Sequence, residues 1–323
     1  MSDSKPASLP PSAAPADLAR VTSTLRTAYH CVTLLTPSDG PTSLLPLLLH
    51  RFPHIPEESW PERFDFGGVY VNGREALGDQ PLPFPCKVEY YEPKFPISEA
   101  HALFPKFEER FVIYQDDAVA VVYKPPRLSS MPAKEQRHFS LKASLEKLFK
   151  KPVHMPSRLD VSAQGLLVVS LHPDAHAKLQ QCFESRKAHK TYFLATTAPV
   201  AWERVSVDLP IARDPRHPVL RTTALGGLEG QPALTHLTRS HLAKSEGSSV
   251  TVVKAEPVSG RTHQIRVHAA SQAAPIFGDN FYGGDSASYL HLVSCSLAIP
   301  HPASGHALHV ELPHELCPGW INR

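Results

Sequence analysis

The sequence lacks clustered cysteines, long apolar runs and a strong excess of either charge. The five cysteines are widely separated, with no Cys-x-x-Cys pair, so neither a zinc site nor a disulfide framework is expected. No apolar run approaches the roughly 18 residues of a membrane helix, and the N-terminus does not resemble a signal peptide. We therefore expect a soluble, cytoplasmic protein without a membrane partner or a bound metal. Because the net charge is only +2, binding to nucleic acid would need a local basic face.

Proline, by contrast, is abundant, and the chain divides into three parts. The 33 prolines predict stiff loops and edge strands, because proline fixes φ and cannot donate a hydrogen bond to a sheet. Residues 1–28 are rich in Ser, Pro and Ala and predict a disordered leader. Residues 29–105 predict a small domain, and residues 106–323 predict the main domain.

The small domain is expected to contain a short helix over residues 43–52, with Pro46 tolerated in its first turn. A strand over residues 68–73 ends in an Asn-Gly turn, and a second strand follows over residues 86–91. This order resembles the S4 RNA-binding module, although a second helix is hard to find because Pro61 occupies that stretch. A small packing subdomain is the alternative interpretation.

The main domain alternates short apolar strands with few helices. Sequential strands of this kind favour an α+β fold with a mixed, largely antiparallel sheet flanked by helices. Strands are expected at residues 119–123, 165–170 and 191–196, a helix at residues 174–186, and a hairpin from residues 234–242 and 249–257.

Two short segments carry polar residues where strands begin. Asp160, in Arg158-Leu159-Asp160, lies five residues before Gly165 and its apolar strand, at a position where a rigid scaffold can meet a cleft. An ordinary surface ion pair is the alternative. Tyr192 begins another strand, and its ring could stack on a base. The alternative for Tyr192 is a half-buried strand residue.

A third segment, residues 259–268, combines a glycine turn with several cationic groups. Thr262 is expected to be the N-cap of a short helix that carries Arg266. The flanks of this helix are apolar, and a guanidinium near a buried wall normally has an anionic partner. Asp160 and a phosphate are both candidates for that partner.

Together these segments resemble the RluA family of pseudouridine synthases over about residues 111–310. The family's motif His-Arg-Leu-Asp-x-x-Thr-Ser-Gly aligns with residues 157–165. Its later signature, Gly-Arg-Thr-His-Gln-Ile-Arg-Val-His followed by Pro-Ile-x-Gly-Asp-x-x-Tyr-Gly, is matched at residues 260–268 and 275–283. Residues 122–125 resemble its opening Lys-Pro strand end, and residues 300–302 its closing segment.

The resemblance implies a pseudouridine synthase fold, an RNA partner (ribosomal or transfer RNA), a monomer, no cofactor and a role for each site residue. Asp160 would be the catalytic carboxylate, acting at C1′ or C2′ of the ribose. Tyr192 would stack on the uracil, and Arg266 would pair with Asp160. Arg158 would contact the RNA as the target uridine is flipped out of its stack.

The sequence departs from the family at Ser157, where histidine is usual, and at Ala163 and Gln164, where Thr-Ser is usual. These departures leave the carboxylate in place but change the support of its loop. Two other functions are carried as alternatives. One is an RNA chaperone-like module on the same fold, and the other is a metal-dependent hydrolase that uses the histidines of residues 291–314.

Overall fold

The computed structural model describes residues 28–36, 41–99, 104–134, 139–224 and 228–322. The expected leader therefore lies outside the described residues, apart from Ala28, which begins the first strand. In the part of the chain that the structure describes, no helix is long and apolar enough to cross a membrane.

The chain forms two compact units. The larger unit contains Glu108–Pro126 and Pro152–Arg323, and the smaller unit contains Thr22–Phe107 and Arg127–Lys151. This division differs from the single boundary between residues 105 and 106 expected from the sequence. Residues 127–151, which include helix α5 (Leu141–Phe149), belong with the smaller unit although they follow strand β6 of the larger unit in the sequence.

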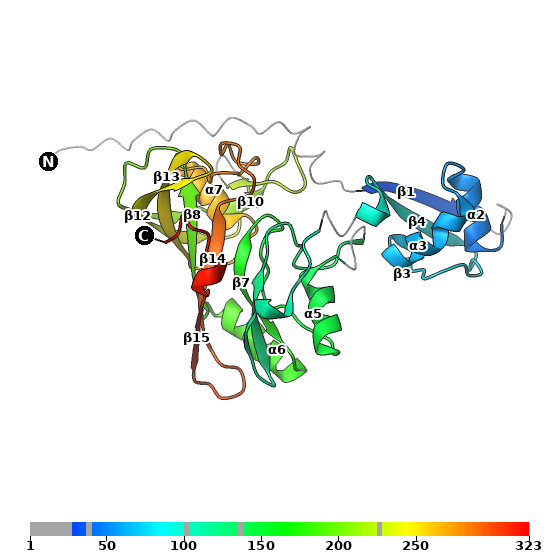
Figure 1. Ribbon diagram of the computed structural model, residues 1–323, viewed down its shortest axis with the longest axis horizontal. Coiled ribbons are helices and arrows are strands. Elements are labelled where there is room, and N and C mark those ends of the chain that lie inside the picture. The colour runs from blue at the N-terminus through cyan, green and yellow to red at the C-terminus, as the bar shows by residue number, and fades with distance from the viewer. Residues whose placement is uncertain (1–27, 37–40, 100–103, 135–138, 225–227, 323) are drawn as a thin grey trace. The chain divides into compact units, whose positions relative to one another are not determined.

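The larger unit is built on a nine-stranded sheet in the order β5-β6-β7-β14-β8-β13-β12-β9, with β15 paired to β14 (Figure 1). Strand β14 pairs in parallel with β7 and antiparallel with β8 and β15, so the sheet is mixed and largely antiparallel. Its strands are β5 (Val112–Gln115), β6 (Val119–Lys124), β7 (Gln164–Ser170), β8 (His189–Thr196), β9 (Arg204–Asp208), β12 (Leu234–Ser245), β13 (Ser248–Pro257), β14 (Leu292–Pro300) and β15 (Ala307–Glu311).

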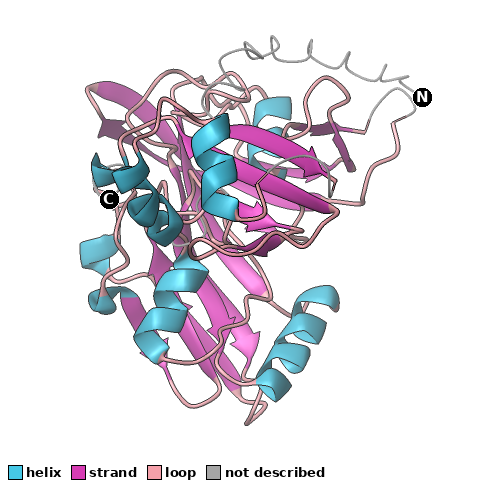
Figure 2. Ribbon diagram, turned by 90° about the vertical axis from the view of Figure 1, so that its right-hand side faces the viewer, coloured by secondary structure: helices cyan, strands magenta, loops and turns pink. Residues whose placement is uncertain are grey.

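Helices accompany this sheet, as Figure 2 shows with strands in magenta and helices in cyan. The elements outside the sheet are η3 (Glu109–Phe111), α6 (Pro173–Glu184), β10 (Ile211–Arg213), β11 (Arg221–Thr223), α7 (Gln264–Ser271) and η5 (His314–Leu316). The α+β class and every strand and helix predicted for the main domain are confirmed, with ends shifted by a few residues.

The smaller unit has a four-stranded sheet in the order β1-β4-β2-β3. Its elements are β1 (Ala28–Leu35), α2 (Leu44–Arg51), η1 (Glu57–Ser59), α3 (Trp60–Phe66), β2 (Val69–Val71), β3 (Arg74–Glu75), β4 (Cys86–Pro93) and η2 (Ile97–Glu99), together with α5. The predicted helix, both predicted strands and the Asn72-Gly73 turn are confirmed. Asn72 and Gly73 have φ of 49° and 76°, as a tight hairpin turn requires.

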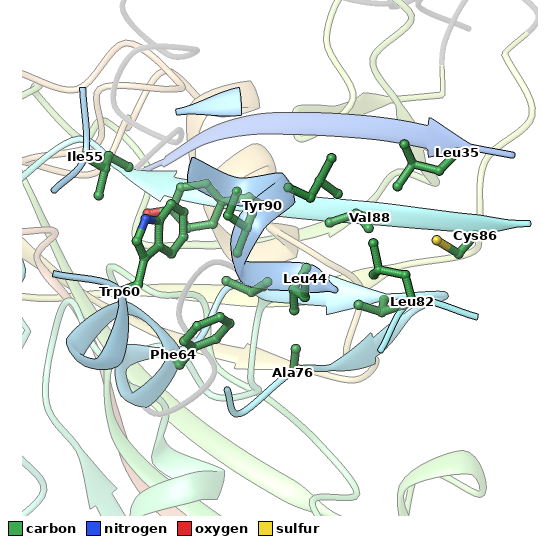
Figure 3. Packing of buried hydrophobic residues seen from close by; sticks show 14 residues of the cluster. Leu35, Leu44, Ile55, Trp60, Phe64, Ala76, Leu82, Cys86, Val88 and Tyr90 are labelled. Carbon is green, nitrogen blue, oxygen red and sulfur yellow. The ribbon is translucent and has the colours of Figure 1, made fainter. Parts of the chain in front are cut away.

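The second helix, which is hard to find in the sequence, is present as α3. Pro61 lies in its first turn, where the missing N–H has no intrahelical partner to lose. Trp60 and Phe64 are four residues apart, so they share one face, and both are buried. The Trp60 and Tyr90 rings lie 5.2 Å apart in the core beneath the sheet (Figure 3). The proline was therefore wrongly interpreted as a helix breaker.

Candidate active site

Asp160 lies in an irregular loop, four residues before the start of strand β7 at Gln164. The Ala163 N–H donates to the Asp160 carbonyl at 3.1 Å, which closes a turn that leads into the strand. Gly165, the second residue of β7, has φ of 114°, and a Cβ placed there would lie 2.2 Å from the Ser294 carbonyl oxygen of β14. Only glycine permits this approach of the two strands, and the approach fixes where the loop ends and β7 begins.

Lys124, the last residue of β6, supports the same loop through hydrogen bonds from its side chain. Its ammonium donates to the carbonyls of Pro125 at 3.0 Å and Val161 at 3.2 Å, and the residue is fully buried. Burial lowers the pKa of Lys124 to about 7, although the nearby Asp160 charge favours the protonated form. The lysine therefore holds the residue directly after Asp160.

Arg266 reaches Asp160 from helix α7. One guanidinium nitrogen, Nη1, donates to Oδ2 of Asp160 at 3.2 Å. The other two, Nε and Nη2, donate to the two oxygens of Asp279 at 2.8 and 2.7 Å. The side chains of Arg266 and Asp279 are 4% and 0% exposed, whereas that of Asp160 is 24% exposed. Of the two carboxylates that pair with Arg266, Asp160 is thus the one that solvent or a substrate can reach.

The residues of α7 are buried around most of the helix, and their polar groups are bonded to neighbouring elements. Gln264 donates to the Leu234 carbonyl and to the Thr235 hydroxyl, at 3.0 and 2.9 Å. His268 lies 2.8 Å from the same hydroxyl and 2.9 Å from the Leu209 carbonyl. These bonds fix the rotation of α7 and therefore the direction in which Arg266 projects.

The predicted N-cap of this helix is wrong. The helix begins after His263, which has φ of 58° and makes no side-chain cap. Thr262 instead accepts a hydrogen bond from the Arg158 guanidinium at 3.2 Å. The left-handed conformation turns the His263 ring inward, where Nε2 lies 3.8 Å from Asp160 and Nδ1 lies 2.6 Å from the Tyr282 hydroxyl.

Asp160 is held in its ionised form. Burial by itself raises the pKa of the Asp160 carboxyl, but its interactions with the basic groups of His263, Arg266 and Lys124, among them the hydrogen bond from the Arg266 guanidinium, bring the pKa below its ordinary value. Burial lowers the pKa of His263 to about 4, so that ring is neutral at neutral pH. Arg266 is therefore the permanent cation that keeps Asp160 charged.

Tyr192 lies on β8 and is paired with Ser294 of β14. On the other side of β14, Ser294 is paired with Gly165 of β7. This register brings the tyrosine and the start of β7 to neighbouring positions in the sheet. The residue is 7% exposed. Burial raises the pKa of the Tyr192 hydroxyl, and the nearby Asp160 charge acts in the same direction, so the group stays a neutral phenol.

Ser157, one of the departures from the family motif, has a defined partner. Its hydroxyl accepts a hydrogen bond from the Lys190 ammonium at 3.0 Å, and that ammonium also lies 4.7 Å from the centre of the Phe183 ring. Gln164, another departure, is buried and accepts a hydrogen bond from the Tyr123 hydroxyl at 2.7 Å. The loop is therefore supported by contacts of its own in place of the usual residues.

The structure thus groups Asp160 with Arg266, as expected, and places Arg158 at the exposed edge of the same loop. The prediction did not identify Asp279, His263 or Lys124 as site residues. All three lie within matched family segments, so the motifs contained the signal. What the sequence could not reveal was that these side chains are buried against the Asp160 loop.

Three of the five histidines of residues 291–314 have separate side-chain partners. His291 lies 2.8 Å from the Ser245 hydroxyl, His301 lies 2.7 Å from the Asp116 carboxylate, and His309 lies 2.9 Å from the Ser296 hydroxyl. Among the described residues, no group of three or more His, Cys, Asp or Glu is placed to hold a metal ion.

Comparison with known proteins agrees with this geometry. The sequence profile of a family described as RNA pseudouridylate synthase matches residues 118–271. Among solved structures, human RNA pseudouridylate synthase domain containing 1 has a similar fold. Its TM-score is 0.56 at 24% identity, and the match covers 65% of this chain and 85% of that one.

Several bacterial proteins are similar in sequence. The dual-specificity RNA pseudouridine synthase RluA of Vibrio vulnificus is 32% identical over 199 residues, which cover 60% of this chain and 78% of that protein. RluA of Escherichia coli is 32% identical over 213 residues, which cover 62% of this chain and 92% of that protein. With the matched motifs gathered around Asp160, these similarities show that the chain belongs to the RluA family of RNA pseudouridine synthases.

Proposed function

We propose that this protein isomerises uridine to pseudouridine in RNA, with Asp160 as the carboxylate that acts at the ribose. The observation that carries the proposal is the ion pair between the partly exposed Asp160 and the buried Arg266. Because Arg266 keeps Asp160 ionised and oriented, the carboxylate is available as a nucleophile or a base.

Two routes fit a carboxylate in this position. Asp160 either attacks C1′ or removes the proton at C2′, and either step breaks the N-glycosidic bond. The freed uracil rotates, C5 bonds to C1′, the C5 proton leaves and N1 gains a proton. The product is an isomer of the substrate, so the reaction consumes no redox cofactor and no water.

The target uridine must leave its stack to reach this carboxylate, because C1′ and C5 are inaccessible in a stacked strand. Tyr192, on the strand beside the Asp160 loop, is the aromatic side chain proposed to stack on the flipped uracil. Arg158 is exposed at the edge of the loop and is proposed to contact the RNA around the vacated position.

The proposed substrate is ribosomal or transfer RNA, and the protein is proposed to act as a monomer in the cytoplasm. In the smaller unit, helices α2 and α3 are followed by β2, the Val-Asn-Gly turn and β4, in the order that resembles the S4 module. We propose that it helps to bind RNA.

Asp160→Asn tests the assignment, because it keeps the shape of the side chain and removes its charge. Tritium released from RNA labelled at C5 of uridine measures turnover, since the C5 proton leaves during the reaction. We expect turnover to fall at least about a thousandfold while RNA affinity is largely kept. Asp117→Asn, in an exposed turn, is the matched control and should retain activity.

Equal turnover by the Asp160→Asn variant would rule out Asp160 as the catalytic group. A wild-type protein that binds RNA without releasing tritium from any cellular RNA would instead favour the RNA chaperone-like alternative.

A further inference from the structure

A groove of about 540 Å³ lies across one end of four neighbouring strands of the larger unit. These strands are β8, β13, β12 and β9, three of which are labelled together in Figure 1. Their register places His236 opposite both Glu256 and Ser206, so the lining residues form a continuous surface. The volume falls within the range of about 300–1,000 Å³ that is typical of ligand sites.

The charged side chains that line this groove are mainly cationic. Arg186, Lys190 and Arg204 contribute positive charge, and His189 and His236 add imidazole groups. Glu256 is the acidic side chain in the lining, and it accepts a hydrogen bond from Lys254 at 2.8 Å, which offsets its charge. On a chain of net charge +2, this is the kind of local basic face that nucleic-acid binding needs.

Arg186 occupies a backbone position that favours glycine. It follows the C-cap of α6 with φ of 58°. The Arg186 N–H donates to the Phe183 carbonyl at 3.2 Å and the Lys187 N–H donates to the Cys182 carbonyl at 3.0 Å, which is the pattern of a Schellman motif. Glycine avoids the steric cost that a side chain has in this conformation. The arginine therefore strains the helix end while placing a charge in the groove.

The groove is connected to the Asp160 loop through Lys190. This lysine lines the groove, and its ammonium donates to the hydroxyl of Ser157, three residues before Asp160 in the sequence. A polyanion lying in the groove would therefore approach the catalytic loop from its N-terminal side.

We infer that this groove binds phosphates of the RNA strand that flanks the target uridine, with Arg186, Lys190 and Arg204 as the contacting cations. The inference rests on the proposed function, because it assigns RNA as the substrate of the same site. An acidic polypeptide is the competing ligand.

Arg186→Gly is the central test, because it removes the charge and supplies the residue that the backbone favours. Binding to a fluorescent oligouridylate is measured by anisotropy over a series of KCl concentrations. We expect affinity to fall about threefold to tenfold and the slope of log K against log salt to shrink by about 0.7. The melting temperature should be unchanged or raised, which separates lost contact from lost fold. The same loss should appear as a higher KM for RNA from cells that lack the gene.

Arg204→Ala should weaken binding in the same way, and Arg110→Ala is the matched control. Arg110 is an exposed arginine just before β5, at the opposite edge of the sheet from β9. Wild-type affinity and salt slope in both groove variants would overturn the inference. Equal binding of polyglutamate, lost equally in Arg186→Gly, would overturn it in favour of an acidic polypeptide.

The two proposals fail in different ways. Active wild type, inactive Asp160→Asn and unaffected groove variants would refute the groove alone. Weakened RNA binding by the groove variants, with no pseudouridine formed by the wild type, would support the groove and refute the proposed reaction.

Discussion

Arg266 contacts two carboxylates that differ in geometry and in exposure. Asp279 is fully buried and accepts two hydrogen bonds from the guanidinium, while Asp160 is partly exposed and accepts one from it. A two-point contact between a guanidinium and a carboxylate fixes orientation as well as charge. Asp279 therefore orients Arg266, and Arg266 in turn presents its remaining nitrogen to Asp160.

Replacing Arg266 with alanine should change the pH dependence of turnover. Without the guanidinium, burial is opposed less and the pKa of Asp160 rises, so protonation removes activity at a higher pH than in the wild type. The stability that ionised Asp160 contributes should likewise be lost earlier as pH falls. The measurement is kcat/KM against pH, together with RNA affinity, which we expect to change less than turnover.

Arg266→Lys is the control for this prediction, because it keeps a positive charge but not the two-point contact with Asp279. The pH at which kcat/KM falls on acidification should stay closer to that of the wild type in Arg266→Lys than in Arg266→Ala. Arg266→Ala could instead weaken RNA binding and leave unchanged the pH at which kcat/KM falls. Arg266 would then be a phosphate contact instead of a positioning residue.

At the scale of elements, the parallel contact between β7 and β14 depends on Gly165. Alanine there would place a Cβ 2.2 Å from the Ser294 carbonyl oxygen, in a backbone conformation with positive φ. We expect Gly165→Ala to lower the free energy of unfolding by several kcal/mol, about 3 or more, and to impair turnover by shifting the Asp160 loop. Urea denaturation measures the first effect.

Gly247→Ala provides the comparison. Gly247 also has positive φ, at 78°, but no atom lies within 4 Å of its added Cβ. Gly247→Ala should lower the free energy of unfolding only by the cost of the backbone conformation, about 1 kcal/mol. Equal destabilisation by both substitutions would show that the close contact with β14 is unimportant.

Most elements could be predicted because their patterns are local. Strand β6 and strand β7 are short apolar runs bounded by turn residues, and α6 has a clear apolar face. Helix α3 could not be predicted in the same way, because its proline is favourable only if the helix begins at that point. The start of α7 was also misplaced, since the left-handed His263 is stabilised by contacts with residues distant in the sequence.

The site was predictable as a set of motifs but not as a set of contacts. Asp160 and Arg266 were identified, and their pairing was expected from the family resemblance. Asp279 was missed as the partner of Arg266, because a sequence does not show which of two acids is buried. The contact of Ser157 with Lys190 likewise depends on how β8 lies beside the loop.

At the scale of the whole molecule, the proposed function predicts a specific change in cellular RNA. Cells that lack the gene should lose pseudouridine at one position or a few, because flipping selects a local RNA shape. Wild-type protein should restore the modification and the Asp160→Asn variant should not. Chemical mapping of pseudouridine in total RNA measures this, and an unchanged map in the deleted strain would contradict the proposal.

The pairing of Arg266 with Asp279 also bears on how such a gene can diverge. Because Asp279 already pairs with the buried guanidinium through two hydrogen bonds, loss of Asp160 leaves Arg266 with a countercharge in the interior. A duplicated copy could therefore lose its chemistry in a single mutation and still fold. Under the proposed function, Asp160 is then under selection for activity alone, and descendants without it would survive as proteins that bind RNA without modifying it.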